Sequence, residues 1–209
     1  MKVREKLPKR RENPTKVPKK GKWSQHKPDL REDFHCHCGY CGSYDGYRHT
    51  WYEVDHFIPK SLFEPLGQIS TEEYSNLVYS CKFCNNNKLS KWPSGDVNIP
   101  NYKNEGFIDP CNSDYDNHLY RMNNGSIMWK TELGKWMWNT AFKFDERNYA
   151  IKLLWEVNQL RKLIFAYSEQ LSKMDEQSND YRALEEKAKD LSFKYVLIHK
   201  DLMDYYNSL

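Results

Sequence analysis

The sequence predicts an α+β protein in which a small strand–strand–helix core precedes an α-helical C-terminal extension. Turn residues and five of the six cysteines are concentrated in residues 31–105, which favours a compact core with short elements. Residues 145–209 contain neither glycine nor proline, which favours long helices. A length of 209 residues allows one substantial domain with extensions, or two small ones, and such a chain buries a core without needing disulfides.

Composition excludes several classes of protein. The hydrophobic fraction is 39% and the mean hydropathy is −0.94. No apolar run approaches the ~18 residues that a membrane helix needs. The first thirty residues are basic and lack the apolar stretch of a secretory signal peptide. Six cysteines are too few for a disulfide scaffold of this size. We therefore expect a soluble protein in a reducing compartment, the cytoplasm, with no membrane partner.

Residues 1–30 differ from the rest of the chain in charge. They carry eleven Lys and Arg against three Asp and Glu, a net charge of +8, whereas the remaining 179 residues carry 21 against 26, a net charge of −5. Four of the nine prolines also lie in this segment, so we expect a disordered or extended basic tail. Two interpretations stay open. The tail tracks a polyanion backbone, or it solubilises the protein or docks on acidic patches of its own body.

Residues 31–105 are expected to form the core domain. The alternation and aromatic content of residues 50–54 predict a strand ending at Asp55. Residues 76–81 predict a second short strand, and residues 84–92 predict a short helix stopped by Pro93. Neighbouring side chains of a strand point to opposite faces, so Asp55 and His56 can take different roles. The predicted order is that of a ββα-metal arrangement.

Residues 106–144 are aromatic and mixed in character, and we expect a hairpin that buttresses the core. Residues 118–122 and 126–129 flank Asn124-Gly125, the strongest short-range signal for a hairpin.

Residues 145–209 predict two helices of about 25–30 residues with heptad-like spacing, longer than a usual globular helix. A polar break at residues 175–180 separates them, and the short connection favours an antiparallel pair. A helical hairpin packed on its own domain is the simpler interpretation. A docking surface for a partner subunit is the alternative. The apolar positions are Val157, Leu160, Ile164, Tyr167, Leu171 and Met174, then Tyr181, Leu184, Ala188, Leu191, Tyr195, Ile198, Leu202 and Tyr205.

Two C-x2-C pairs, 39 residues apart, predict one structural zinc site with the ligands Cys38, Cys41, Cys81 and Cys84. A two-residue spacer lets one tight turn present two thiolates to the same ion. Cys36 or His37 could replace Cys38, although the spacing favours Cys38. A closed four-cysteine site has no open coordination position, so it shapes the core and leaves the chemistry to other residues.

Between and after these pairs the chain resembles the zinc-bound HNH endonucleases. Those proteins read C-x2-C, then D-H-x-x-P, then N-L, then C-x2-C-N-x-x-K, and the match covers residues 36–92. The corresponding residues here are Cys38 and Cys41, Asp55-His56 with Pro59, Asn76-Leu77, and Cys81 with Cys84-Asn85 and Lys88.

The resemblance implies that His56 is the general base, and that Asp55 and Asn85 bind a catalytic divalent ion. Asn76 would then hold the loop and orient His56. Histidine accepts a proton at neutral pH, and oxygen ligands suit a hard ion such as Mg²⁺ or Mn²⁺. Many HNH members have histidine where this chain has Asn85, so it is an H-N-N variant.

The expected activity is hydrolysis of phosphodiester bonds in DNA, with RNA not excluded. Lys88 and Lys91, three residues apart, are expected to contact the phosphate backbone. The alternative is a non-catalytic zinc-knuckle nucleic-acid-binding or adaptor subunit.

Residues 106–127 also look similar, through looser motifs, to the HNH effectors of Septu and retron antiphage defence systems, which are encoded beside an ATPase. This resemblance implies a role in antiviral defence and an ATPase partner subunit bound through the C-terminal helices.

Overall fold

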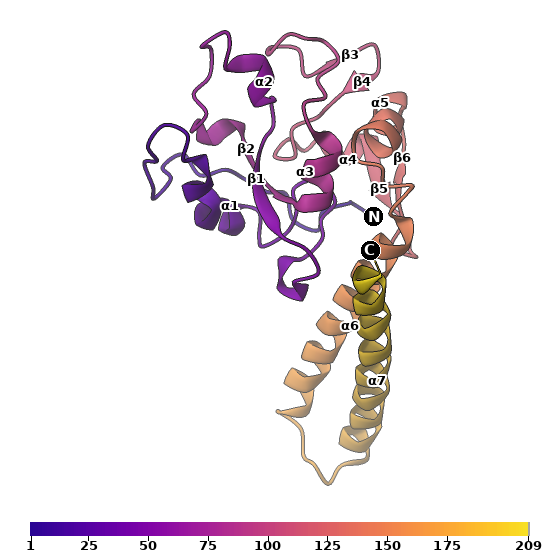
Figure 1. Ribbon diagram of the computed structural model, residues 1–209. Coiled ribbons are helices and arrows are strands. Elements are labelled where there is room, and N and C mark those ends of the chain that lie inside the picture. The colour runs from indigo at the N-terminus through magenta and orange to yellow at the C-terminus, as the bar shows by residue number, and fades with distance from the viewer. Residues whose placement is uncertain (209) are drawn as a thin grey trace. The chain divides into compact units, whose positions relative to one another are not determined.

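The computed structural model describes residues 1–208 and divides the chain into two compact units, Met1–Asn148 and Tyr149–Leu209. Figure 1 shows the order of the elements along the chain. The predicted α+β class is confirmed: short strands and helices form the first unit, and two long helices account for nearly all of the second.

The centre of the first unit is the pair of strands β1 (Tyr52–His56) and β2 (Leu77–Cys81), followed at once by helix α3 (Lys82–Lys88). The strands are antiparallel, with Asp55 opposite Val78 and His56 opposite Leu77. Every residue of β2 is buried, whereas β1 is buried at its two ends. The strand–strand–helix order that the sequence predicts is therefore present, with β1 extending one residue further, through His56.

Helix α3 is shorter than expected and begins earlier. The sequence predicts a helix over 84–92, but it spans Lys82–Lys88. Leu89 has a φ of 50°, which is outside the helical range and ends the helix four residues before Pro93.

Short elements surround this centre. Before β1 lie η1 (Trp23–His26), α1 (Lys27–Asp33) and η2 (Asp45–Tyr47). Between β1 and β2 lie α2 (Lys60–Phe63) and η3 (Tyr74–Asn76). After α3 come the small pair β3 (Asn101–Tyr102) and β4 (Glu105–Gly106), and then α4 (Tyr115–His118).

A second hairpin follows α4. Strands β5 (Leu119–Arg121) and β6 (Ile127–Trp129) pair antiparallel around Gly125, whose φ of 88° suits the tight turn that the Asn-Gly signal predicts. Helix α5 (Glu132–Trp136), capped by Thr131, continues into the π-helical turn η4 (Met137–Ala141). Aromatic rings from four segments of this unit pack together, and they belong to Phe57, Trp92, Phe107 and Phe142.

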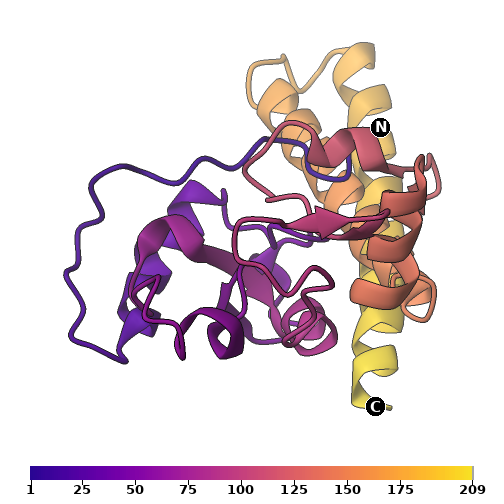
Figure 2. The ribbon, with the colours of Figure 1, turned by 90° about the horizontal axis from the view of Figure 1, so that it is seen from above.

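The basic N-terminal segment follows an extended path along the first unit before α1 (Figure 2). Its arginines bind acidic side chains of the same unit. Arg4 binds Asp116 at 3.1 Å, and Arg10 binds Asp109 at 2.9 Å. Val3 and Arg4 are buried. The arginines of this segment therefore dock on acidic side chains of the first unit, which is one of the two interpretations given above.

The second unit is a pair of helices, α6 (Asn148–Leu171) and α7 (Asn179–Asn207). They are antiparallel, since Tyr149 near the start of α6 contacts Tyr205 near the end of α7. Ser178 caps α7 by accepting a hydrogen bond from the backbone of Tyr181. No helix among residues 1–208 is both long enough and apolar enough to cross a membrane.

Candidate active site

Strand β1 presents its acidic residues and His56 to different surroundings. Glu53 and Asp55 are two residues apart and so share one face of the strand. Both of these carboxylates contact side chains of α3, through Asn85 and Lys88. The ring of His56 lies against other residues, Trp23 at 5.1 Å and Phe63 at 5.6 Å between ring centroids. The strand thus separates the carboxylates from the imidazole, as the alternation of its side chains predicts.

The ring of His56 is held in one orientation. Its Nε2 lies 2.8 Å from the carbonyl oxygen of Thr71. A carbonyl oxygen only accepts hydrogen bonds, so Nε2 carries the hydrogen and the neutral ring has its lone pair on Nδ1. No side-chain or backbone group of residues 1–208 is hydrogen-bonded to Nδ1. That nitrogen is therefore ready to accept a proton.

Burial lowers the pKa of His56 below the ordinary value for histidine, and the charges of Lys88 and Lys60 act in the same direction. The Thr71 carbonyl and the Asp55 carboxylate oppose this change without overcoming it. The side chain is consequently neutral, and able to act as a base, at neutral pH.

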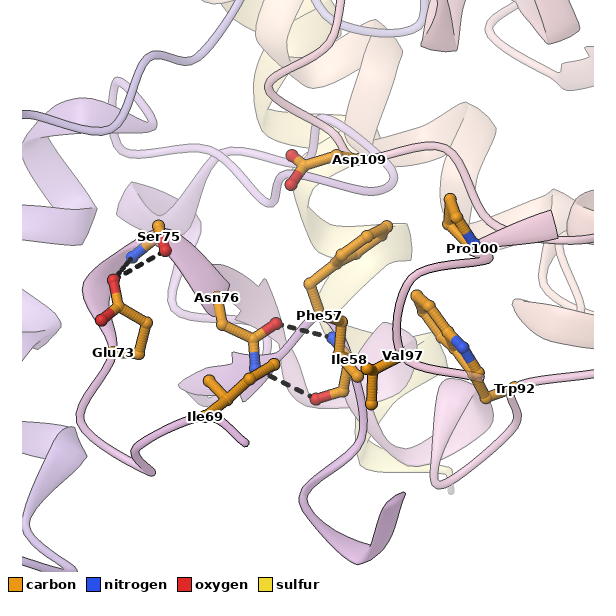
Figure 3. A pocket seen from close by; sticks show the side chains of 10 residues that line it. All are labelled: Phe57, Ile58, Ile69, Glu73, Ser75, Asn76, Trp92, Val97, Pro100 and Asp109. Atoms are coloured by element: carbon orange, nitrogen blue, oxygen red, sulfur yellow. Dashed lines mark hydrogen bonds between the residues drawn. The ribbon is translucent and has the colours of Figure 1, made fainter. Parts of the chain in front are cut away.

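Asn76 clamps the loop that follows His56. Its side-chain Oδ1 accepts a hydrogen bond from the backbone N–H of Ile58 at 2.8 Å, and its Nδ2 donates to the carbonyl oxygen of Ile58 at 3.1 Å (Figure 3). The backbone N–H of Phe57 also donates to the carbonyl oxygen of Asn76, at 2.8 Å. The chain directly after His56 is therefore fixed by three hydrogen bonds to one buried asparagine.

A cavity of about 350 Å³ lies beside this loop, and Asn76, Ile58, Trp92 and Asp109 are among the residues that line it (Figure 3). The carboxylate of Asp109 is engaged elsewhere, by Arg10 and by the backbone N–H of Cys111. The cavity is therefore a feature of the loop's packing, and the groups that could do chemistry lie on β1 and α3.

Asp55 is buried, and two groups contact its Oδ2 atom. The hydroxyl of Tyr40 donates to Oδ2 at 2.6 Å, and the ammonium of Lys88 lies 3.3 Å from the same atom. Burial, followed by the charge of Asp55, raises the pKa of Tyr40 well above its ordinary value, so the phenol stays protonated and keeps donating. Asp55 Oδ1 accepts no hydrogen bond from residues 1–208 and is the oxygen left for a cation.

The structure corrects the expectation for Lys88. Its side chain is fully buried, and its ammonium donates to the carbonyl oxygen of His56 at 2.8 Å as well as facing Asp55. An ammonium bonded in this way inside the protein is not available to a phosphate group of a nucleic acid. Lys91 lies beyond the end of α3, partly buried, with its ammonium on the carbonyl oxygen of Asn87. The two lysines therefore do not share a helix face.

Asn85 is oriented by a residue that the sequence analysis did not single out. Its Nδ2 donates to a carboxylate oxygen of Glu53 at 2.6 Å. A carboxylate only accepts, so the amide nitrogen must face Glu53, and the amide oxygen points elsewhere as a free ligand atom. The period-two alternation that places Glu53 on the same face as Asp55 is the signal that could have identified it. Thr71 acts through its backbone carbonyl, and no residue type signals that.

The donors at the junction of β1 and α3 fit a hard divalent ion. Asp55 Oδ1 and the amide oxygen of Asn85 are both oxygen atoms, the ligand type that Mg²⁺ and Mn²⁺ prefer. Two contacts join α3 to β1: Asn85 donates a hydrogen bond to Glu53, and the ammonium of Lys88 lies beside the carboxylate of Asp55. The ammonium of Lys88 therefore occupies one side of Asp55, and an ion would use the other side.

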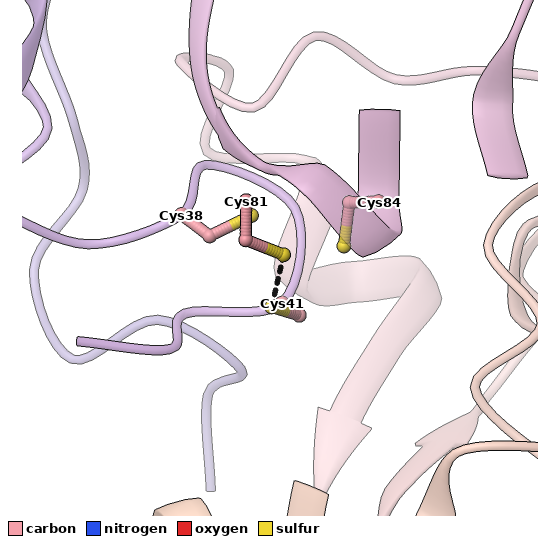
Figure 4. Close-up of side chains that lie close together, drawn as sticks. All are labelled: Cys38, Cys41, Cys81 and Cys84. Atoms are coloured by element: carbon pink, nitrogen blue, oxygen red, sulfur yellow. Dashed lines mark hydrogen bonds between the residues drawn. The ribbon is translucent and has the colours of Figure 1, made fainter. Parts of the chain in front are cut away.

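The four expected zinc ligands come together. The Sγ atoms of Cys38, Cys41, Cys81 and Cys84 all lie within 4.8 Å of one another and are buried (Figure 4). The sulfurs of Cys41 and Cys81 are 3.8 Å apart, which matches the ~3.8 Å edge of a tetrahedron with Zn–S bonds of about 2.3 Å. The predicted four-cysteine cluster is thus confirmed as a site able to hold zinc.

The neighbouring Cys36, His37 and Cys111 are not part of this cluster. Cys36 and His37 were the alternatives to Cys38, and the geometry selects Cys38. All six cysteines are free of disulfide bonds.

A guanidinium lies beside the cysteine cluster. Arg147 places one nitrogen 3.5 Å from the Sγ of Cys84 and packs over the ring of Phe83. Burial alone would lower the pKa of Arg147, but the negative charges of Cys84 and Cys81 outweigh it and raise the pKa. A zinc ion with four thiolates carries a net charge of −2, which such a guanidinium would offset in part.

A comparison with known protein families agrees with this geometry. Residues 38–91 match the model of the HNH endonuclease family, so the match begins at the first zinc ligand and ends after α3. This segment is an HNH domain. No curated protein and no solved structure matches the chain. The HNH domain includes both cysteine pairs, β1, β2 and α3, and it indicates a nuclease that acts on nucleic acid.

Proposed function

We propose that this protein is a metal-dependent endonuclease that hydrolyses phosphodiester bonds in DNA, with His56 as the general base. The observation that carries the proposal is the hydrogen bond from His56 Nε2 to the Thr71 carbonyl, at 2.8 Å, which leaves Nδ1 as the proton acceptor. The lowered pKa of His56 supports the same role, because a neutral imidazole can accept a proton at neutral pH.

The reaction divides its tasks among these residues. Nδ1 of His56 removes a proton from a water molecule, and the resulting hydroxide forms a bond to the phosphorus as the bond to the 3′ oxygen breaks. The 3′ oxygen takes a proton from solvent, and the other product carries a 5′-phosphate. Asn76 keeps the loop after His56 in place through its two bonds to Ile58, so the imidazole does not need to reorient during the reaction.

We assign the catalytic ion, Mg²⁺ or Mn²⁺, to Asp55 and Asn85. When bound, such an ion stabilises the negative charge that develops on the phosphate and on the leaving oxygen. Tyr40 and Lys88 hold the carboxylate of Asp55, and Glu53 turns the amide of Asn85 so that its oxygen faces away from the carboxylate. The Zn²⁺ at the four cysteines is structural, since a closed thiolate shell leaves no position for substrate.

The test is cleavage of supercoiled plasmid and of single-stranded DNA by the purified protein with Mg²⁺ or Mn²⁺. His56→Ala should abolish cutting while leaving the zinc content and the circular dichroism spectrum unchanged. His199→Ala is a matched control, because this histidine lies on α7 and outside the HNH domain. Equal cutting by wild type and His56→Ala would remove His56 from the mechanism.

The second candidate is a non-catalytic nucleic-acid-binding or adaptor subunit built on the same zinc scaffold. The burial of Asp55 and its ion pair with Lys88 favour it, because a buried, paired carboxylate can serve structure alone. The two candidates differ in one result. A folded, zinc-loaded protein that binds DNA with equal affinity in wild type and in His56→Ala, and cuts under no metal condition, would be the adaptor.

We further propose a cytoplasmic role in antiphage defence, with an ATPase partner subunit bound through the C-terminal helices. Large apolar side chains on α7 support a docking role, since Phe193, Val196 and Leu197 are all exposed and lie within two turns. Co-purification of an ATPase from the native host, compared between wild type and Phe193→Ser/Leu197→Ser, tests the partner. Equal recovery of the ATPase by both proteins would place its binding site elsewhere.

A further inference from the structure

The N-terminal segment contains two kinds of basic residue with different surroundings. Its arginines are bound within the first unit: Arg4 to Asp116, Arg10 to Asp109, and Arg11 to Asp29 and Asp33. The lysines that follow are arranged differently. An exposed loop over residues 16–22 carries four of them, and none has an ion-pair partner among residues 1–208; they are Lys16, Lys19, Lys20 and Lys22.

This lysine loop, residues 16–22, is fixed next to the candidate general base. The backbone N–H of Gly21 donates to the carboxylate of Glu72, the residue after Thr71, whose carbonyl holds His56. Trp23 follows the loop directly, and its ring lies 5.1 Å from that of His56. Consecutive Cα atoms are about 3.8 Å apart, so Lys22 and Lys20 begin within a few ångströms of these two anchors.

The lysine loop and Lys60 together carry more positive charge than the acids beside them offset. Lys60 adds a further ammonium, 5.1 Å from the centre of the Trp23 ring. Its partner Glu64 is 3.5 Å away and both side chains are partly exposed to solvent, so this pair is weak. Glu72, the acid that contacts the loop, accepts hydrogen bonds from Gly21, Ser70 and Thr71, keeps its negative charge and offsets one of the positive charges. Four loop lysines and Lys60 against Glu64 and Glu72 still leave a net positive charge, which attracts a polyanion.

The side-chain type indicates what the loop would recognise. Lysine is a flexible point charge that binds phosphate without the planar geometry through which arginine also reads base edges. Contacts to phosphate fix the position of a nucleic acid and carry no sequence information. The loop is therefore suited to hold a sugar–phosphate backbone in any sequence.

We propose that residues 16–22 form a phosphate-binding arm that holds the DNA backbone next to the bond cut at His56. The proposal rests on the nuclease function proposed above and adds the surface that positions the substrate. Trp23 and Gly21 anchor the arm, and Lys19, Lys20 and Lys22 supply the charge. The arm contributes affinity and placement, whereas proton transfer belongs to His56.

The test compares two triple substitutions in the same segment. Lys19→Gln/Lys20→Gln/Lys22→Gln removes three charges from the arm. Lys2→Gln/Lys6→Gln/Lys9→Gln is the matched control, because these lysines are also exposed but lie earlier, around the Arg4 and Arg10 ion pairs. Binding of a fluorescein-labelled DNA duplex by both variants is measured without added Mg²⁺ or Mn²⁺, so that no cleavage occurs and His56 keeps its contact with Trp23.

Each phosphate contact contributes about 0.9 to the slope of log K against log salt concentration for duplex DNA. The arm substitutions should reduce this slope by about 2–3, whereas the control should reduce it by less than about 1. A similar reduction by both triples, or none by the arm triple, would overturn the proposal.

Cleavage separates this result from the wider function. With Mg²⁺ or Mn²⁺ added, the arm triple should raise the KM for plasmid about tenfold or more and leave kcat nearly unchanged. If wild type cuts plasmid and the arm triple binds and cuts as well as wild type, the arm is excluded while the nuclease stands. If wild type never cuts but the arm triple alone loses its salt-dependent binding, the arm stands and the catalytic proposal fails.

Discussion

Replacing Lys88 with methionine tests whether its ammonium is a structural group of the candidate active site. The fully buried side chain donates to the His56 carbonyl at 2.8 Å and lies 3.3 Å from Asp55 Oδ2. Methionine has a similar length and keeps the contact with the ring of Phe107, but it removes the charge. Breaking a buried ion pair by removing one partner costs about 3–5 kcal/mol, because the other charge stays buried. We expect the free energy of unfolding to fall by that amount.

Urea unfolding followed by circular dichroism measures this change, and the melting temperature should fall by about 2–4 °C for each kcal/mol. Lys91→Met is the control. Its ammonium is only partly buried and bonds a carbonyl at the end of α3, so its loss should cost about 1 kcal/mol. The double variant Lys88→Met/Asp55→Asn should be more stable than the sum of the two single losses predicts, since removing both charges leaves none unpaired.

Two results would refute this reasoning. One is a loss of less than about 1 kcal/mol for Lys88→Met, within the range of surface substitutions and ordinary hydrogen bonds. The other is strict additivity of Lys88→Met and Asp55→Asn. Suppose that either result is found and that Lys88→Met also flattens the salt dependence of DNA binding. Lys88 would then contact phosphate, as its position in the sequence predicts.

Three further predictions concern the same domain. Cys81→Ser should lose zinc and unfold the core, because zinc binding is part of the folding free energy; metal analysis and a thermal melt measure this, and an unchanged melting temperature would contradict the zinc assignment. The acid limb of kcat/KM should lie below about pH 6.5, since burial lowers the pKa of His56 and activity is lost only as pH falls through that value; a limb at or above about 6.5 would exclude His56 as the titrating base. Asn76→Ala should lower kcat and cost about 1–3 kcal/mol of stability by freeing the Ile58 backbone, and unchanged kcat would show that the clamp has no part in catalysis.

Short spacings in the sequence are sufficient to predict the zinc cluster and the strand–strand–helix core. A two-residue spacer can be closed by one turn, so each cysteine pair is determined locally. The alternation along residues 50–54 likewise predicts β1 and the opposite orientations of Asp55 and His56, because strand geometry leaves little choice. These features depend on neighbours in the chain, which a single sequence contains.

Features that depend on distant neighbours could not be predicted in the same way. Lys88 looks like any surface lysine in the sequence, and only the approach of α3 to β1 buries its ammonium beside Asp55. Arg10 binds Asp109, which lies ninety-nine positions later in the chain. Nothing local in the basic, proline-containing segment therefore indicates that it follows an ordered path. Glu53 gains its role from Asn85, thirty-two positions away. In each case two segments must be packed before the partner is known.

The zinc cluster and the proposed catalytic residues are linked because they share the same elements. Cys81 is the last residue of β2, Cys84 lies in α3 one position before Asn85, and Asn76 directly precedes β2. Any movement of the second cysteine pair therefore moves both Asn76, which holds the loop after His56, and Asn85, which donates to Glu53 of β1. A metal with no open coordination position can thus matter for the proposed activity, because it helps to fix the packing of α3 on β1 that places Asn85 on Glu53 and Lys88 on Asp55.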